Sequence, residues 1–154
     1  MTMKWSSVFS SFRIIKVALL LLLVSCTGSK MEPYVYGQEF EAYLEAIDAK
    51  LDFEKVILLP LDSCGLCVEQ VLEDLQKSNQ GFSVIFSGEK NSPDRVEKAK
   101  KLFQKENLQI IIDENSKSKS FDLNAFSPII LDVSKKEYSY ASLSPQNSPE
   151  YILD

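Results

Sequence analysis

The stretch Val56–Leu75 reads VILLPLDSCGLCVEQVLEDL and contains two cysteines between an apolar run and a helical pattern. The apolar run, which breaks at Pro60, is typical of a strand that is buried on both faces. After the cysteines, valines and leucines recur at the spacing of an amphipathic helix. Cys64 and Cys67 therefore lie where a buried strand passes into a helix, which is the arrangement of a dithiol redox site.

The first 25 residues have the features of a secretion signal. Three basic residues accompany an apolar centre, VALLLLLV, at residues 17–24, and no acidic residue occurs before Glu32. This centre is about half of the roughly 20 residues that a membrane-spanning helix requires, which disfavours an uncleaved anchor. The leader ends in Leu23-Val24-Ser25-Cys26, which resembles the bacterial lipobox. The resemblance implies that residues 1–25 are removed and that Cys26 is lipidated. The alternatives are an ordinary cleaved signal and a cysteine that stands at this position by chance.

Lipidation of Cys26 leaves Cys64 and Cys67 as the remaining cysteines of the three in the chain. An extracytoplasmic location permits these two thiols to form a disulfide. We therefore expect a protein of the bacterial cell envelope that is held to a membrane by its lipid.

Charge and histidine content exclude several classes of function. Loss of the leader removes three of the 17 basic residues, so 14 remain against 22 acidic ones and the net charge is near −8. Nucleic acid is therefore not an expected partner. The chain has no histidine, which excludes Cys-His and Ser-His catalysis and imidazole metal ligands. One Cys-x-x-Cys supplies only two of four zinc ligands, so we expect neither a metal nor a cofactor.

The remaining patterns predict one domain at residues 38–154 after a tether at residues 26–37. Helices are expected over residues 38–51, from the cysteines to residue 78, and over 92–107. Strands are expected over 55–61, 82–86, 109–112, 129–133 and 137–141. The serine-rich stretch 113–122 is expected to be a loop with a short helical turn, and its lysines to form a solvated face. A very short final helical turn is expected at 151–153. The predicted fold class is α/β: a central mixed sheet flanked by helices, with an inserted helix and strand and a C-terminal antiparallel hairpin.

This order of elements resembles the thioredoxin fold, and in particular the membrane-anchored TlpA-like thiol:disulfide oxidoreductases of bacteria. The resemblance covers roughly residues 38–141. It implies that Cys64 is the nucleophile and Cys67 the resolving thiol. It also implies that Pro128, preceded by Ser127, is cis and faces the thiols. The implied partners are client proteins with disulfides or thiols, together with a redox donor in the membrane.

The residues around the cysteines support a redox role without that resemblance. At a helix N-terminus the Cys64 thiolate faces unpaired N–H groups and the positive end of the helix dipole, which lowers the pKa of the thiol. Gly65 and Leu66, between the cysteines, are expected to face the site, and Leu66 adds no positive charge. Asp62 and Glu69 flank the pair. Nearby anions raise the pKa of a thiol, which predicts a reducing couple.

Three features depart from the thioredoxin pattern. Ser63 stands where a tryptophan commonly precedes the motif, and Leu58 occupies the position of the buried carboxylate. Proton transfer from Cys67 would then require Asp62 or Glu54. The third departure is the very short C-terminal helix.

Two other functions fit parts of the same sequence. A binding module could carry the cysteines as a structural disulfide. A peroxiredoxin-type peroxidase could use Cys67, which lies seven residues after Pro60, although Cys64 replaces the threonine of that pattern. The only arginine available to such a site in the mature chain is Arg95.

Overall fold

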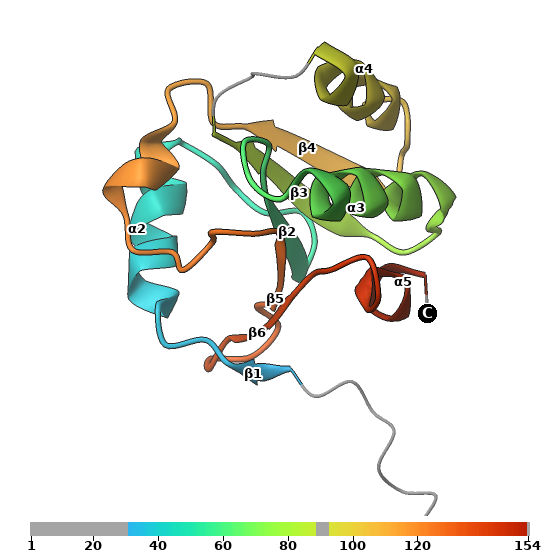
Figure 1. Cartoon of the computed structure of the whole chain (residues 1–154). Helices are drawn as coiled ribbons and strands as arrows, with labels where there is room; N and C mark the ends of the chain where they lie inside the picture. Colours follow the sequence, from blue (N-terminus) through green and yellow to red (C-terminus); the bar gives the residue numbers. More distant parts are fainter. Residues whose placement is uncertain (1–30, 89–92, 154) are drawn as a thin grey trace, which may run out of the picture.

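The computed structural model describes residues 31–88 and 93–153, which form one mixed sheet with helices on both faces (Figure 1). The leader, Cys26 and the predicted helix start at Ser92 lie outside these residues. The strands of the described part are β1 (Glu32–Pro33), β2 (Lys55–Pro60), β3 (Phe82–Ser87), β4 (Leu108–Ile112), β5 (Ile129–Asp132) and β6 (Ser139–Ser142). Its helices are α2 (Gly37–Ala46), α3 (Gly65–Lys77), α4 (Pro93–Leu102), the 3-10 helix η1 (Lys117–Ser120) and α5 (Ser148–Ile152). Within the described residues, no helix combines the length and apolar character needed to cross a bilayer.

The strand order is β1-β6-β5-β2-β3-β4. β2, β3 and β4 are parallel, whereas β5 runs antiparallel to both β2 and β6. α3 connects β2 to β3, and the predicted insertion consists of α4 and β4. β5 and β6 form the predicted hairpin. The α/β fold class is confirmed, and the arrangement is compatible with a thioredoxin-like fold.

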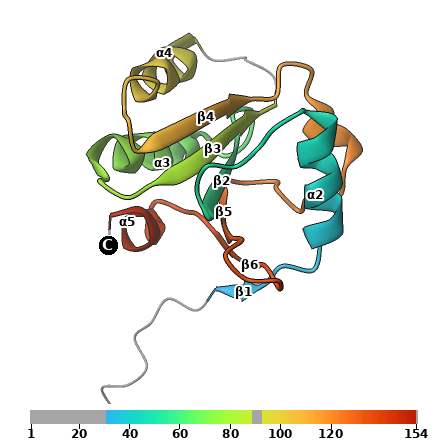
Figure 2. The same ribbon diagram turned by 180° about the vertical axis from the view of Figure 1, so that it is seen from behind.

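Alternate residues of the central strands build two separate cores. On the side of α3, α4 and α5, the strands contribute Ile57, Leu59, Val84 and Phe86. On the side of α2, they contribute Val56, Leu58, Ile85 and Ile129. Figure 2 shows the two helical layers from behind, with α2 apart from α3 and α5. Because both faces are covered, β2 and β3 must be apolar at successive positions rather than at every second one.

α2 ends at Ala46, before the predicted end at Leu51. Asp48 has a φ of 52°, in the left-handed region. The N–H of Ala49 donates to the carbonyl of Leu44 at 3.0 Å and closes the helix end. A left-handed residue with such a bond is a common way to terminate a helix. The apolar periodicity continues past this turn, which is why the pattern overestimates the length of α2.

α4 also ends earlier than predicted, at Leu102. Beyond it, Lys105 donates its Nζ to three backbone carbonyls at the end of α3, those of Leu75 (3.0 Å), Gln76 (2.9 Å) and Ser78 (2.6 Å). An ammonium group at a helix C-terminus satisfies carbonyls that have no partner within the helix. Lys105 therefore joins the inserted helix to the end of α3.

The sheet begins within the segment that the sequence places in the tether. β1 pairs antiparallel with β6, with Glu32 beside Tyr140. The next residue after β1, Tyr34, is buried, and its hydroxyl donates to the carbonyl of Leu123 at 2.7 Å. One buried aromatic between turn-forming residues produces no periodic pattern, so the sequence does not reveal this strand.

The short C-terminal helix α5 is held on α3 by buried polar contacts. The Ser148 hydroxyl donates to the Asp74 carboxylate at 2.7 Å, and the Ser78 hydroxyl donates to the carbonyl of Ile152 at 2.6 Å. Ser148 and Asp74 are 0% and 1% exposed. These bonds anchor a helix that is too short to be stable alone.

Ser148→Ala is expected to lower the free energy of unfolding by about 1.5–3 kcal/mol, because it removes a buried hydrogen bond to a carboxylate. Urea unfolding followed by circular dichroism measures this change. Ser120→Ala, the same substitution at an exposed serine of η1, is the matched control and should change stability by less than about 0.5 kcal/mol. Equal stability of the two variants would contradict the anchoring role of Ser148.

Candidate functional site

Cys64 and Cys67 form a disulfide at the N-terminus of α3, with their Cα atoms 5.3 Å apart. Cys64 is the N-cap residue, and its sulfur accepts the N–H of Cys67 at 3.4 Å. Cys64 is exposed, whereas Cys67 is only 9% exposed. A reagent in solvent therefore reaches the sulfur of Cys64 first.

Three hydrogen bonds shape the turn between β2 and the disulfide. The N–H of Leu61 donates to the carbonyl of Ser87 at 2.9 Å and extends the pairing with β3 past Pro60. The N–H of Ser63 donates to the carbonyl of Pro60 at 3.1 Å, and its hydroxyl donates to the same oxygen at 2.7 Å. Ser63, which replaces the expected tryptophan, is thus a turn residue of the kind that short polar side chains form.

The peptide bond before Pro128 is trans, because the described residues contain no cis peptide bond, so the cis expectation is wrong. Trans is the form that an X-Pro bond favours by about 0.5–1 kcal/mol, and the pattern here supplies nothing to override that preference. The carbonyl of Pro128 accepts the N–H of Leu143 at 2.7 Å at the start of the hairpin. The register sets Ile129 opposite Leu58, so the buried Pro128 lies beside the end of β2 that leads to Cys64.

The other residues expected to face the site differ in exposure. Ser127 is half-buried directly before Pro128, and Gly65 is a half-buried residue at the start of α3. Leu66, between the cysteines, is 73% exposed. Leu66 therefore presents an apolar side chain to solvent between the two cysteines of the disulfide.

Of the two carboxylates suggested for proton transfer, only Asp62 lies at the redox end of β2. Glu54 precedes the strand, and six residues of strand separate it from the turn, a distance of about 20 Å. Asp62 stands two residues before Cys64. Leu58, at the position of the usual carboxylate, is 2% exposed and belongs to the core on the α2 side.

Both acidic residues that flank the cysteines have lysine partners. Asp62 Oδ2 lies 3.7 Å from Lys119 Nζ, and Glu69 Oε2 lies 3.9 Å from Lys98 Nζ. The lysines of the loop 113–122 are exposed, as predicted for a solvated face, and Lys119 also brings positive charge to the turn before Cys64. Each lysine offsets the negative charge of its partner, and that negative charge would otherwise raise the thiol pKa. Asp62 and Glu69 therefore favour a reducing couple less strongly than the sequence alone indicates.

Asp113, which none of the sequence patterns above singled out, holds the segment that carries Lys119. Its buried carboxylate accepts the N–H groups of Lys117 and Ser118, both at 2.8 Å, and the hydroxyl of Tyr43 at 3.2 Å. Burial, and then the charge of Asp113, raises the pKa of Tyr43 above its usual value, so the phenol keeps its proton and donates. The sequence signal was an Asp followed by other cap-forming residues directly after a strand.

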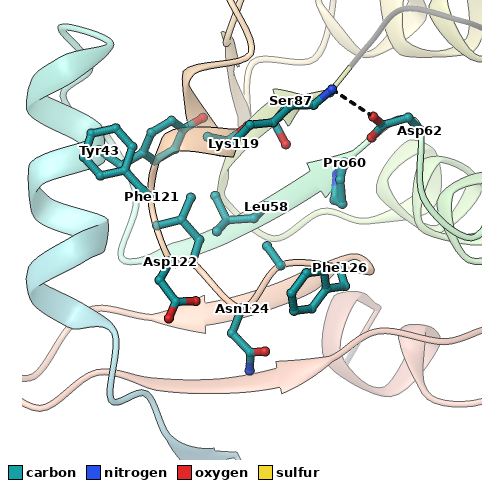
Figure 3. A pocket seen from close by; sticks show the side chains of 14 residues that line it. Tyr43, Leu58, Pro60, Asp62, Ser87, Lys119, Phe121, Asp122, Asn124 and Phe126 are labelled. Atoms are coloured by element: carbon teal, nitrogen blue, oxygen red, sulfur yellow. Dashed lines mark ion pairs between the residues drawn. The ribbon is translucent and has the colours of Figure 1, made fainter.

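A pocket of about 300 Å³ opens beside the turn that leads to the disulfide (Figure 3). Leu58 and Pro60 of β2 line it, with Asp62 and Lys119 on one side and Asn124 and Phe126 on the other. Segments from α2, β2, the end of β3 and the loop after η1 all contribute. Because the walls come from distant parts of the chain, no local sequence pattern indicates this pocket.

Gly88, after β3, allows Asp62 to take its place in the pocket wall. Its φ is +84°, in the region that favours glycine. A Cβ atom at this position would overlap the carboxylate of Asp62. The close approach of the two loops therefore requires glycine at this position.

Comparison of the chain with protein-family models, with characterised proteins and with solved structures gave no match. The function is therefore inferred from the residues themselves. A disulfide, an acid–lysine pair and a pocket all lie at the carboxyl end of the central strand β2.

Lys119→Ala is expected to raise the pKa of the Cys64 thiol in the reduced protein, because it removes a positive charge that offsets Asp62. The pH dependence of alkylation by iodoacetamide measures this as a midpoint at higher pH. Asp62→Asn should move the midpoint to lower pH, and the double variant should return close to the wild type. Lys136→Ala, a lysine lost from the exposed turn of the hairpin, is the charge-matched control. A midpoint that is the same in the Lys119→Ala and Lys136→Ala variants would contradict an effect of Lys119 on the pKa of the Cys64 thiol.

Proposed function

We propose that this chain is a lipid-anchored, extracytoplasmic thiol:disulfide oxidoreductase of the TlpA-like kind that acts on client proteins. The observation that carries the proposal is the disulfide between an exposed Cys64 and a buried Cys67 at the start of α3. A structural role explains this disulfide less well. It closes a loop with only two intervening residues, and so short a loop constrains the unfolded chain little.

In the reduced protein, the Cys64 thiolate attacks one sulfur of a client disulfide. A bond forms between Cys64 and the client, and the other client sulfur leaves as a thiolate. Cys67 then attacks the Cys64 sulfur, which re-forms the observed disulfide and releases the second client thiol. Two electrons pass from the protein dithiol to the client, so the cycle requires a dithiol reductant, which we place in the membrane.

The start of α3 favours the thiolate that this reaction needs. The Cys67 N–H already points at the Cys64 sulfur, and the first turn of α3 contains no acidic residue. Free N–H groups and the helix dipole stabilise an anion at this position. Cys67 must lose its proton before it attacks, and Asp62 is the carboxylate of the adjacent turn that we assign to accept it.

The anchor would keep this chemistry close to the membrane. Cys26 lies six residues before Glu32, the first residue of β1. Even a fully extended chain spans only about 20 Å over that length. A domain held so near the bilayer suits a donor that is itself a membrane protein.

Replacement of single cysteines separates an oxidoreductase from a binding module. Cys64→Ser is expected to abolish reduction of a protein disulfide, because the attacking sulfur is lost. Cys67→Ser is expected to accumulate mixed disulfides with clients, since nothing resolves the bond to Cys64. Non-reducing electrophoresis with mass spectrometry detects these adducts, and a variant with both cysteines replaced is the control.

Other outcomes of the same experiment would point elsewhere. A Cys64→Ser variant that keeps the wild-type phenotype in cells would support a binding module with a structural disulfide. Peroxide consumption that is lost with Cys67 but kept without Cys64 would support a peroxidase. The side chain of Arg95, which such a peroxidase would need, lies outside the described part of the structure.

Cys26→Ser tests the anchor. The wild-type protein is expected to incorporate radiolabelled palmitate and to sediment with membranes, whereas the variant should do neither. Incorporation is measured by autoradiography of the purified protein, and a serine at Cys64 provides a control that keeps the label. Labelling of the Cys26→Ser variant would refute lipidation at this residue.

A further inference from the structure

The pocket beside the turn that leads to the disulfide has a largely apolar lining. Its apolar residues come from α2, β2 and the loop before β5: Tyr43, Leu58, Pro60, Phe121, Leu123, Ala125 and Phe126. Asp62, which stands two residues before Cys64, belongs to the same wall. A group that occupies the pocket is therefore held next to the turn that carries the reactive sulfur.

One large apolar side chain of the pocket lining and one between the cysteines are strongly exposed. Phe126, on the pocket lining two residues before Pro128, is 87% exposed, and Leu66 is 73% exposed between the cysteines. Figure 3 shows Phe126 and Asn124 on the side of the pocket opposite Asp62 and Lys119. Large apolar groups kept in solvent beside a reactive site are typical of surfaces that bind a partner.

The charges of the lining limit what can bind. Asp62 and Asp122 contribute two carboxylates, against the single ammonium group of Lys119 that lies 3.7 Å from Asp62. An acidic side chain in the pocket would be repelled by the carboxylates of the lining and would lose its hydration against an apolar wall. An uncharged, large apolar side chain meets neither penalty and gains from burial against Phe126.

We propose that this pocket receives an aromatic or large aliphatic side chain adjacent to the cysteine of a client polypeptide. The proposal rests on the oxidoreductase function and defines the substrate class of the same site. The client cysteine lies over Cys64, and its apolar neighbour lies between Phe126 and the end of β2. Segments with an acidic residue at that position are poor substrates.

The test uses reduced full-length protein and short synthetic peptides in which one cysteine is disulfide-bonded to thionitrobenzoate. Attack of Cys64 on the peptide sulfur releases the coloured thiolate, so absorbance gives the rate. Three peptides differ only in the residue next to the cysteine, which is Phe, Ala or Asp. The Phe peptide is expected to react about ten-fold faster than the Asp peptide, because partial burial of one aromatic side chain supplies enough free energy for that difference in rate.

Phe126→Ser is expected to reduce this ten-fold ratio to near one. Val35→Ser, at an apolar residue that is 81% exposed and does not line the pocket, should keep the ratio. Equal rates for the three peptides on the wild-type protein, or an equal loss of the ratio in both variants, would overturn the pocket assignment while leaving the oxidoreductase intact. No reaction with any peptide or with glutathione disulfide would overturn the oxidoreductase and the pocket assignment together.

Discussion

The position of the disulfide depends on one backbone hydrogen bond, from the N–H of Leu61 to the carbonyl of Ser87. It continues the parallel pairing of β2 and β3 by one residue beyond Pro60, whose ring supplies no N–H. Ser63 then closes the turn on the carbonyl of Pro60. Because β2 is packed on both faces, this end of the strand cannot shift without disturbing two cores. These contacts fix the start of α3, and with it Cys64, at the carboxyl end of the central strand β2.

Asp113 has a corresponding role at the end of β4. A single buried carboxylate, bound by two backbone N–H groups and the Tyr43 hydroxyl, orders η1. η1 in turn brings Lys119 to Asp62, and the loop that follows it lines the pocket as far as Phe126. The inserted strand therefore does more than widen the sheet. The residue that directly follows it, Asp113, orders η1, and Lys119 of η1 connects this wall of the pocket to the turn before Cys64.

The sequence predicts the parts of this protein that follow from local patterns. β2, α3 and β3 were expected because apolar runs and helical spacing are properties of neighbouring residues, and Cys64 and Cys67 were found by their spacing. β1 was missed because Tyr34 is a lone buried aromatic, and α2 was predicted too long because Asp48 ends it through backbone conformation. The cis form expected for Pro128 came from a resemblance and not from the residues themselves, and it is wrong. The contact of Asp113 with Tyr43 and the lining of the pocket depend on residues far apart in the chain, which no local pattern can show.

Leu58 stands where the resemblance to thioredoxins led us to expect a buried carboxylate. This side chain belongs to the core that Tyr43, Leu123 and Ile129 also form, where an unpartnered carboxylate would be strongly destabilising. The turn between β2 and Cys64 instead carries Asp62 at the surface, where Lys119 offsets its charge and Gly88 allows its approach. Asp62 therefore belongs to the turn, the ion pair and the pocket at once. If the protein is the proposed oxidoreductase, a change at Asp62 would alter thiol reactivity and client binding together, whereas a change at Phe126, on the opposite wall, would alter client binding alone.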